Sequence, residues 1–430
     1  MSSNVAKISG WLLLGSLVLS VVSALTPLRS FWAGIPVWLA AILLLPCVKP
    51  NQKKQIVALL LIGSLCLIFG VIHGMSGQYL LTALEANQKV INMLIAVGFL
   101  KLCTGAEQRA PGMLPKGRRA LLRTLLGAHL FGAVLNMSSV IIVGDRLAKH
   151  EQITPVQGLL LLRAFCICAF WSPFFAAMGL TLVSAPGSQL STLVLFGIPV
   201  SLAGIAVSAW EILRQPSAKE LHGYPMAWDS LWMPCFLALV VIFAHEAFAS
   251  LSVLTLVSVT SVSFTALWLL LNHGSRAGSQ TMIRHIESGI AGSAGEVVLF
   301  AAAALLAAGV AGVLTSLDLH LAPAHFGYIE AGITLLILVV LAMTGMHPVT
   351  SVVLAGSILA PAVSDPNLLG LTLLMGWSLG ISLSPFSGVQ LSIQSRYEIS
   401  AGTLLKLNWR YALLMYGFCF TLLWIYTRMT

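Results

Sequence analysis

Two pairs of short polar segments interrupt the long apolar stretches of this chain. The first pair is Asn136-Met137-Ser138-Ser139 with Trp171-Ser172-Pro173-Phe174, and the second is His347-Pro348-Val349-Thr350-Ser351 with Leu383-Ser384-Pro385-Phe386. Their hydroxyl, amide and imidazole groups can bind a small ion or solute, and none of the four segments contains a carboxylate. Each proline also removes a backbone N–H, which leaves a carbonyl group without a helical partner.

The two pairs are related by a single shift of 212 residues. Ser139 maps onto Ser351 (351 − 139 = 212), and the same shift carries Ser172-Pro173-Phe174 onto Ser384-Pro385-Phe386. Isolated serines in membrane proteins often serve only to bring helices close together. Polar, proline-interrupted segments at corresponding places in two halves instead indicate a transporter binding site, because backbone leaves helical pairing within lipid only where it lines a cavity.

The expected binding residues are therefore Asn136, Ser138, Ser139, Ser172, Pro173, His347, Thr350, Ser351, Ser384, Pro385 and Ser387. N–H groups at the starts of half-helices favour an anion. Hydroxyl and carbonyl oxygens favour a hard cation, so sodium is expected at Ser139, Ser172, Ser351 and Ser384. No other metal and no cofactor is expected, which leaves sodium or a proton as the coupling ion.

Other polar side chains have more than one interpretation. His347 is a substrate donor, a proton carrier, since an unperturbed histidine titrates near pH ~6.5, or a structural histidine. Arg163 lies in an apolar segment and either contacts substrate or extends along its helix to the cytoplasmic face. Asp145 and Arg146 are expected to form a local ion pair, and Glu211 is expected at a membrane interface.

Composition places the chain in a membrane. Its 430 residues are 58% hydrophobic and 9% charged, which leaves too little polar surface for a water-soluble globule. The net charge of +9 comes from basic residues placed where a cytoplasmic membrane face needs them, so membrane lipid is an expected partner and nucleic acid is not. The seven cysteines are interpreted as small apolar residues, and Gly309 with Gly312 as a close-packing surface.

The expected fold is an all-α polytopic membrane protein with about 11 transmembrane helices, two re-entrant hairpins and inverted-topology repeats. Its expected parts are an extra N-terminal helix (1–27), repeat 1 (28–214), a cytoplasmic linker (215–230) and repeat 2 (231–430). The hairpins are expected at 118–150 and 328–361, and the broken helices at 156–188 and 367–397. We call 136–139 and 347–351 tip 1 and tip 2, and 171–174 and 383–387 break 1 and break 2.

The orientation of the repeats follows from two independent features. If each hairpin is counted as not crossing the membrane, an odd number of crossings lies between the start of repeat 1 and the start of repeat 2. The second repeat is therefore expected to be inverted relative to the first. Basic residues gather in the segments that this topology places inside, such as 49–54, 116–123 and 214–219, whereas the outer segments hold mainly Arg29, Lys89 and Arg428. The chain is thus expected in a bacterial inner membrane with its N terminus in the cytoplasm and its C terminus outside.

This order of hairpins and broken helices resembles the ion transporter superfamily, in particular the divalent anion:sodium symporters and their arsenite, citrate and sodium/proton antiporter relatives. The family carries Ser-Asn-Thr-like hairpin tips and Gly-Thr-Pro-Pro-Asn-like breaks. Here neither tip reads Ser-Asn-Thr, and both breaks keep one proline but lack the following asparagine. The resemblance implies that the hairpins and broken helices move together as a transport domain, against a scaffold that forms a homodimer.

The expected function is secondary active transport of a small solute, with an organic or inorganic anion favoured, by an elevator-like alternating-access mechanism. A proton/sodium antiporter is one alternative. A polytopic membrane enzyme of lipid-linked glycan synthesis is another, but the short outer loops and the repeat argue against it, so the chain is not expected to be an enzyme. A channel or a purely structural protein would not need two hairpins and two broken helices.

Overall fold

A computed structural model describes residues 3–103, 114–149, 151–225, 232–248 and 250–430. The regular elements in these ranges are helices, and an isolated bridge between Lys116 and His222 is the only strand-like pairing there. Six helices of the described ranges are long and apolar enough to cross a membrane, and shorter apolar helices accompany them. The predicted all-helical membrane class is confirmed, and the predicted number of crossings stays a prediction.

The chain forms two compact units, and each unit draws on both halves of the sequence. Unit 1 consists of Met1–Ala106, Leu239–Ala322 and Val353–Pro361. Unit 2 consists of Glu107–Ala238, Pro323–Val352 and Ala362–Thr430. Both tips and both breaks belong to unit 2, so all the expected binding residues lie in one compact body.

Unit 1 is organised around the packing of α3 (Pro50–Ile72) along α13 (Ala294–Ser316). A Cβ atom on Gly309 would lie 2.6 Å from the carbonyl oxygen of Gly63, so the glycines allow these helices to approach closely, as predicted. The other helices of unit 1 are α1 (Ser3–Leu25), α2 (Phe31–Leu44), α4 (Gln78–Glu85), α5 (Gln88–Phe99) and α12 (Val253–Arg284). Helix α11 (Trp232–Ala247) crosses the boundary between the units.

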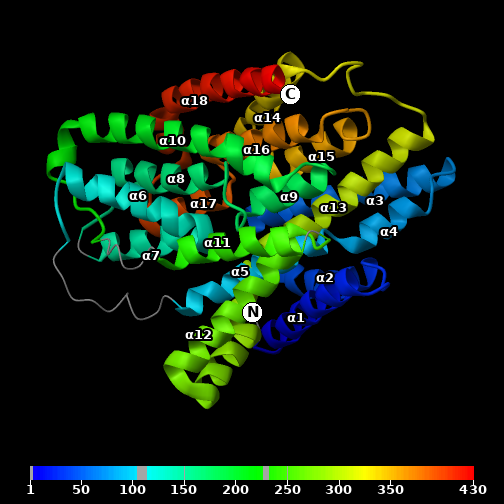
Figure 1. Ribbon diagram of the computed structural model, residues 1–430, viewed down its shortest axis with the longest axis horizontal. Coiled ribbons are helices and arrows are strands. Elements are labelled where there is room, and N and C mark those ends of the chain that lie inside the picture. Colours follow the sequence, from blue (N-terminus) through cyan, green and yellow to red (C-terminus); the bar gives the residue numbers. More distant parts are fainter. Residues whose placement is uncertain (1–2, 104–113, 150, 226–231, 249) are drawn as a thin grey trace. The chain divides into compact units, whose positions relative to one another are not determined.

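The centre of unit 2 is formed by α8 (Pro155–Cys168) and α16 (Pro366–Leu383), which are in contact (Figure 1). Every residue of α16 from Leu368 onward is buried, as expected for a helix that is apolar on all sides. Around these two pack α6 (Arg118–Leu135), α10 (Leu190–Arg214), α14 (Tyr328–Met343) and α18 (Ala401–Met429). The central helices therefore carry the two breaks into the interior of the unit.

Local signals set the starts of both central helices. Thr154 accepts a hydrogen bond from the N–H of Gln157, and the Gln157 side chain in turn accepts from the N–H of Thr154, which makes a reciprocal cap at α8. At α16, Asp365 accepts from the N–H groups of Asn367 and Leu368. A proline occupies the first turn of each helix, where its missing N–H costs nothing.

The polar segments lie where the sequence predicts turns and breaks. At tip 1, α6 ends and α7 (Met137–Ala148) begins at Asn136, whose φ of 52° is tolerated by asparagine better than by most residues. At tip 2, Gly345 with φ of 108° lies between α14 and α15 (Pro348–Leu359). Break 1 separates α8 from α9 (Ala176–Ser184), and break 2 separates α16 from α17 (Gly388–Tyr397).

Helix bounds in the two halves follow the 212-residue shift. Adding 212 to the bounds of α7, α9 and α10 gives 349–360, 388–396 and 402–426. The helices observed at these places, α15, α17 and α18, cover 348–359, 388–397 and 401–429. This agreement supports the predicted repeat, while its inverted orientation in a membrane stays a prediction.

Candidate functional site

Serine hydroxyls replace backbone partners at both breaks. Ser172 accepts a hydrogen bond from the N–H of Phe174 at 3.2 Å, and Ser384 accepts from the N–H of Phe386 at 3.4 Å. These two contacts are related by the 212-residue shift. Pro385 has no N–H to give to the Ile381 carbonyl, and the Ser387 hydroxyl donates to that oxygen instead, at 2.9 Å. The serines of the breaks thus hold the interrupted backbone in shape.

Tip 1 and the last turn of α6 before it are each joined to break 1 by a hydrogen bond. The Asn136 side-chain amide donates to the carbonyl oxygen of Phe174 at 2.9 Å. The Ser172 hydroxyl donates to the carbonyl oxygen of Ala133, on the last turn of α6. Ser139 is buried and donates to the carbonyl oxygen of Asn136 at 2.9 Å, within its own turn. Tip 1 and break 1 are therefore one connected substructure.

Tip 2 and the turn before it pack closely against α16 and break 2. A Cβ atom on Gly345 would lie 2.9 Å from the ring of Phe386, and one on Gly380 would lie 3.4 Å from the side chain of Pro348. The N–H of Val349 donates to Nδ1 of His347 at 3.2 Å. His347 therefore caps the first turn of α15, which favours its structural interpretation at this nitrogen.

Two side chains near the tip and break of the second half retain unused hydrogen-bonding atoms. Thr350 is 2% exposed and its hydroxyl has no hydrogen-bond partner. Gln390 is fully buried; its amide nitrogen donates to the carbonyl oxygen of Ser382 at 2.9 Å, and its amide oxygen has no partner. A buried polar atom without a partner costs free energy, so such atoms are candidates for contact with an ion or solute.

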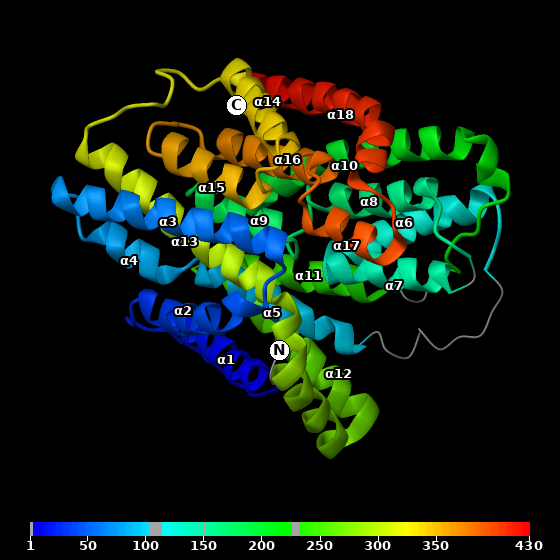
Figure 2. The same ribbon diagram turned by 180° about the vertical axis from the view of Figure 1, so that it is seen from behind.

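Helices α7 and α17 lie side by side and run in the same direction (Figures 1 and 2). Near their starts, a Cβ atom on Gly388 would be 3.7 Å from the sulfur of Met137. Near their ends, Asp145 contacts Arg396. The sequence separation is 251 residues in both contacts (388 − 137 and 396 − 145), as expected for two helices that run in parallel. The N termini of the two half-helices are therefore neighbours, at the place where tip 1 meets break 2.

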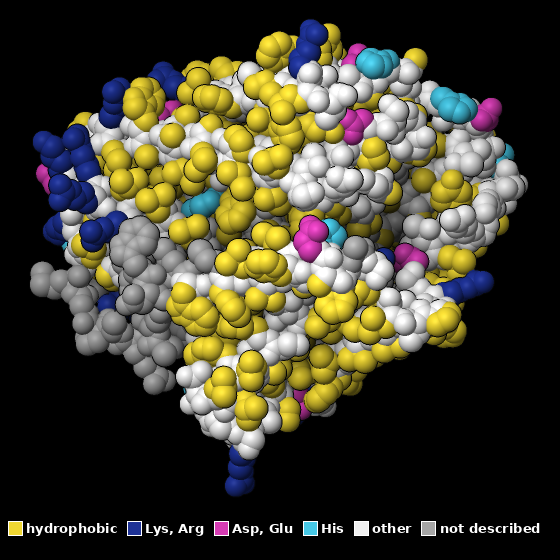
Figure 3. Space-filling model, in the orientation of Figure 1, with side chains coloured by type: hydrophobic (Ala, Val, Ile, Leu, Met, Phe, Trp, Pro, Cys, Tyr) yellow, Lys and Arg dark blue, Asp and Glu magenta, His cyan; other side chains and the backbone are white. Residues whose placement is uncertain are grey.

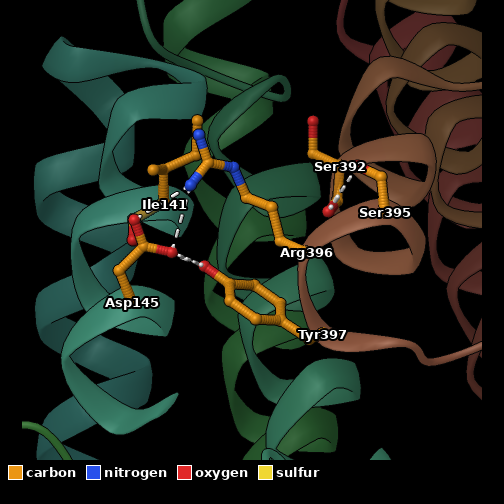
Figure 4. Close-up of polar contacts among 6 residues, drawn as sticks. All are labelled: Ile141, Asp145, Ser392, Ser395, Arg396 and Tyr397. Carbon is orange, nitrogen blue, oxygen red and sulfur yellow. Dashed lines mark hydrogen bonds and ion pairs between the residues drawn. The ribbon is translucent and has the colours of Figure 1, made fainter. Parts of the chain in front are cut away.

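The far ends of these two helices are joined by a polar clasp, formed by Asp145 with Arg396 and Tyr397 (Figure 4). Arg396 and the Tyr397 hydroxyl each approach the Asp145 carboxylate to 3.0 Å. The expected local pair of Asp145 with Arg146 is thus corrected to a contact between hairpin and broken helix. Sequence proximity favoured Arg146 as the partner. The parallel packing of α7 and α17 instead brings two donors on α17, Arg396 and Tyr397, to the Asp145 carboxylate.

Arg163 lies in a buried polar cluster instead of extending to a membrane face. Its side chain is fully buried, and one guanidinium nitrogen is 2.6 Å from the Glu211 carboxylate on α10. Its Nε donates to the Asn408 side chain at 2.9 Å, and the Tyr411 ring lies 4.2 Å from the guanidinium carbon. Glu211 is thus the partner of a buried cation, and its place at a membrane interface stays a prediction.

Asn408 connects this cluster to the last turn of α16, directly before break 2. Its amide nitrogen donates to the carbonyl oxygen of Ser382 at 2.9 Å, the same oxygen that accepts from Gln390. Sequence reasoning did not single out Asn408 or Gln390. For Asn408 the available signal was an amide within a long apolar segment, where polar residues are costly and usually have a defined partner. Gln390 lies in a short polar stretch, which gave no such signal.

His129 of α6 is a further residue that sequence reasoning missed. It is buried, its Nδ1 lies 3.2 Å from the carbonyl oxygen of Ala164, and its Nε2 accepts from the indole N–H of Trp171 at 3.2 Å. Nε2 accepts a hydrogen bond and Nδ1 donates one to a carbonyl oxygen, so the ring is the neutral tautomer that carries its proton on Nδ1. His129 thereby fixes Trp171, the first residue of break 1.

The structure thus brings most of the expected binding residues together within unit 2. Tip 1 contacts break 1 and the start of α17 directly after break 2, tip 2 packs against α16, and the turn before tip 2 packs against break 2. Most of the set is buried, namely Ser138, Ser139, Ser172, Pro173, Thr350, Ser351, Ser384 and Ser387. Asn136, His347 and Pro385 are partly exposed. Arg163 lies apart from this set in its own ion pair, and no group of three metal-binding side chains occurs in the described ranges.

These features define a polytopic helical membrane protein with two hairpins and two broken helices. Among solved structures, the chain is similar to the crystal structure of the YdaH transporter of Alcanivorax borkumensis, which is described as having an unusual topology. The TM-score is 0.53 at 14% sequence identity, over 88% of this chain and 98% of that chain. No protein-family model and no curated protein matches the sequence. At this identity the likeness establishes a shared fold.

Proposed function

We propose that this chain is a secondary active transporter that moves a small organic or inorganic anion across the membrane, coupled to sodium or protons. The fold shared with a membrane transporter supports the general class. The finer assignment rests on unit 2, where hairpin tips meet helix breaks and backbone groups lack helical partners. Such sites bind ions and small solutes in secondary transporters.

The observation that carries the anion assignment is the parallel pairing of α7 and α17. Their N termini are neighbours, and neither is capped by the side chain before it, since Asn136 donates to Phe174 and Ser387 to Ile381. The first N–H groups of an uncapped helix and its dipole favour negative charge. Two such ends side by side favour a carboxylate or an oxyanion over a neutral or cationic solute.

Sodium is the proposed coupling ion because the groups around the tips are neutral oxygens. The Thr350 hydroxyl is buried without a partner, and the Gln390 amide oxygen is in the same state. Sodium prefers such oxygen ligands, whereas a proton carrier needs a titratable group. His347 could serve as one, but its Nδ1 already accepts from the N–H of Val349.

An elevator-like movement of unit 2 relative to unit 1 is proposed for alternating access. Both tips and both breaks belong to unit 2, so the proposed site can move as one body. Helices α10 and α18 also belong to this unit, which makes the proposed moving body larger than the hairpins and broken helices alone. The second hairpin is divided, because Val353–Pro361 belongs to unit 1.

The proposed function is tested by purifying the full chain and measuring its thermal stability with monocarboxylates, dicarboxylates, sulfonates and oxyanions, each with and without sodium. An anion that stabilises only with sodium is then tested for uptake into proteoliposomes under an imposed sodium or proton gradient. Gly388→Leu places a bulky side chain between the two N termini and should abolish binding. Gly417→Leu, on α18 where a Cβ atom meets open space, is the matched control.

A further inference from the structure

One side of α10 carries the pattern of residues that is expected at the border of a lipid bilayer. Leu195, Ile198 and Leu202 are exposed and recur at helical spacing, as expected of a stripe that faces lipid. Trp210 continues this stripe and is 53% exposed. Arg214 lies one turn later, with its guanidinium carbon 4.7 Å from the centre of the Trp210 ring. Tryptophan and arginine in this order mark the transition from acyl chains to headgroups.

The segment that follows α10 is held firmly against the start of α6. The N–H of Gly117 donates to the carbonyl oxygen of Leu221 at 2.9 Å, and the N–H of Gly223 donates to the carbonyl oxygen of Pro115 at 2.8 Å. The side chain of Gln157, at the start of α8, donates to the carbonyl oxygen of His222 at 2.8 Å. The headgroup-level surface next to Arg214 is therefore built from fixed backbone.

Five exposed cations lie on this fixed surface, which we call the basic rim: Lys116, Arg118, Arg119, Arg214 and Lys219. Figure 3 shows Lys and Arg side chains gathered at this end of unit 2, on the left edge of the view. In the described part of the chain, no ion pair involves any of the five. The nearby carboxylates are Glu220 and Glu151, and Glu151 is engaged by His222 at 3.0 Å. The rim thus carries a net positive charge at headgroup level.

We propose that the basic rim binds the phosphate groups of anionic phospholipids. Arginine presents a planar fork of donors that matches phosphate oxygens, and the lysines add compact positive charges around it. The apolar stripe of α10 would receive the acyl chains while the rim holds the headgroup, a combination that a free phosphate ion cannot use. The partner is therefore a lipid and not a soluble anion.

The test uses the full-length protein in a neutral detergent, titrated with phosphatidylglycerol, phosphatidylcholine or inorganic phosphate. Bound lipid is measured by native mass spectrometry, and stability by thermal unfolding. Wild-type protein should retain phosphatidylglycerol preferentially and gain stability from it, with an affinity that falls as salt rises. Lys116→Gln, Arg118→Gln and Arg119→Gln together should weaken this binding roughly 100-fold, since each cation near an anionic surface contributes about fivefold.

The matched control removes the same charge from unit 1, through Lys54→Gln, Arg276→Gln and Arg284→Gln, and should keep wild-type lipid affinity. Arg214→Gln with Lys219→Gln removes charge from the rim without touching α6, so it gives an independent answer if the first variant folds poorly. Equal phosphatidylglycerol affinity in the rim variants and the control would overturn the proposal. Equal stabilisation by inorganic phosphate, or no preference over phosphatidylcholine, would also overturn it.

Discussion

The hydroxyl of Ser378 donates a 2.7 Å hydrogen bond to the carbonyl oxygen of Cys166, and the two residues are 212 positions apart (378 − 166 = 212). If the predicted repeat relates the two halves by an axis, residues that correspond to each other touch only near that axis. This contact shows that α8 and α16 cross at two residues that the 212-residue shift relates. Both breaks lie six residues beyond it, since 172 − 166 and 384 − 378 are equal.

The crossing predicts a strict size limit at position 378. Ser378→Ala removes one buried hydrogen bond and should lower the free energy of unfolding by about 0.5–1 kcal/mol. Ser378→Leu adds volume where two helix backbones are close and should cost about 1–3 kcal/mol. Thr421→Leu on the exposed side of α18 is the control and should change stability by less than about 0.5 kcal/mol. Equal tolerance of leucine at 378 and 421 in denaturant unfolding would contradict the crossing.

The clasp of Asp145 with Arg396 and Tyr397 predicts that substrate affinity depends on residues far from the tips. A Cβ atom on Gly144 would overlap the Tyr397 hydroxyl, so Gly144→Ala should push α17 away and separate the two N termini. We expect a several-fold loss of anion affinity with little change in maximal transport rate. Gly417→Ala meets open space and should be neutral or stabilising, because alanine is the better helix former.

A charge exchange provides the independent check on the clasp. Asp145→Arg alone places two cations together and should weaken anion binding, whereas adding Arg396→Asp should restore most of it. Cysteines in place of Met137 and Gly388 report the spacing of the N termini without any substrate, through their rate of crosslinking. A clasp variant that leaves both crosslinking and affinity unchanged would show that the pairing of α7 and α17 does not depend on it.

The hairpins and breaks could be predicted from sequence because their causes are local. Pro173 and Pro385 remove backbone donors wherever they occur in a helix. The serine before each proline accepts a hydrogen bond from the N–H of the phenylalanine after it. Asn136 likewise provides a residue that accepts a left-handed conformation between two helices. These features repeat at one spacing, which made their correspondence visible without a structure.

The partners of the charged residues could not be predicted because they are set by packing. Asp145 meets Arg396 only because α7 and α17 run in parallel, and nothing near either residue encodes that. Arg163 has its carboxylate on α10 and its amide on α18, at separations of 48 and 245 residues (211 − 163 and 408 − 163). An apolar helix with one charge indicates that a partner exists, but several acidic residues were equally available.

The ion pair of Arg163 with Glu211 predicts that removing the carboxylate lowers the free energy of unfolding more than removing the guanidinium does. Glu211→Gln leaves a fully buried guanidinium without its counterion and should cost about 3–5 kcal/mol. Arg163→Met should cost less, because the Glu211 side chain is 20% exposed and can be solvated. Both are measured by denaturant unfolding in detergent. The reverse order would mean that another anion, such as bound substrate, neutralises Arg163.

If the second repeat is inverted in the membrane, as the sequence predicts, two loops lie on opposite sides of the membrane. In a variant without native cysteines, a cysteine at exposed Ala324 should react with an impermeant thiol reagent added outside intact cells. A cysteine at exposed Lys116 should react only after the cells are permeabilised. Labelling of both positions from the same side would rule out the inverted arrangement.

Replacing Thr350 gives the sharpest test of sodium coupling. The substitution should stabilise the sodium-free protein and should remove the further stabilisation that sodium provides. Its buried hydroxyl has no partner, so Thr350→Val should raise the stability of the sodium-free protein by about 1 kcal/mol. If the hydroxyl is a sodium ligand, the same substitution should abolish the rise in melting temperature that sodium produces.

Thr181→Val on α9 is the matched control, since that hydroxyl is also buried without a partner but lies outside the tips and breaks. It should raise stability and keep the sodium response. A sodium response that survives Thr350→Val would remove Thr350 from the site, and transport that ignores sodium but is lost in His347→Ala would assign the coupling to protons.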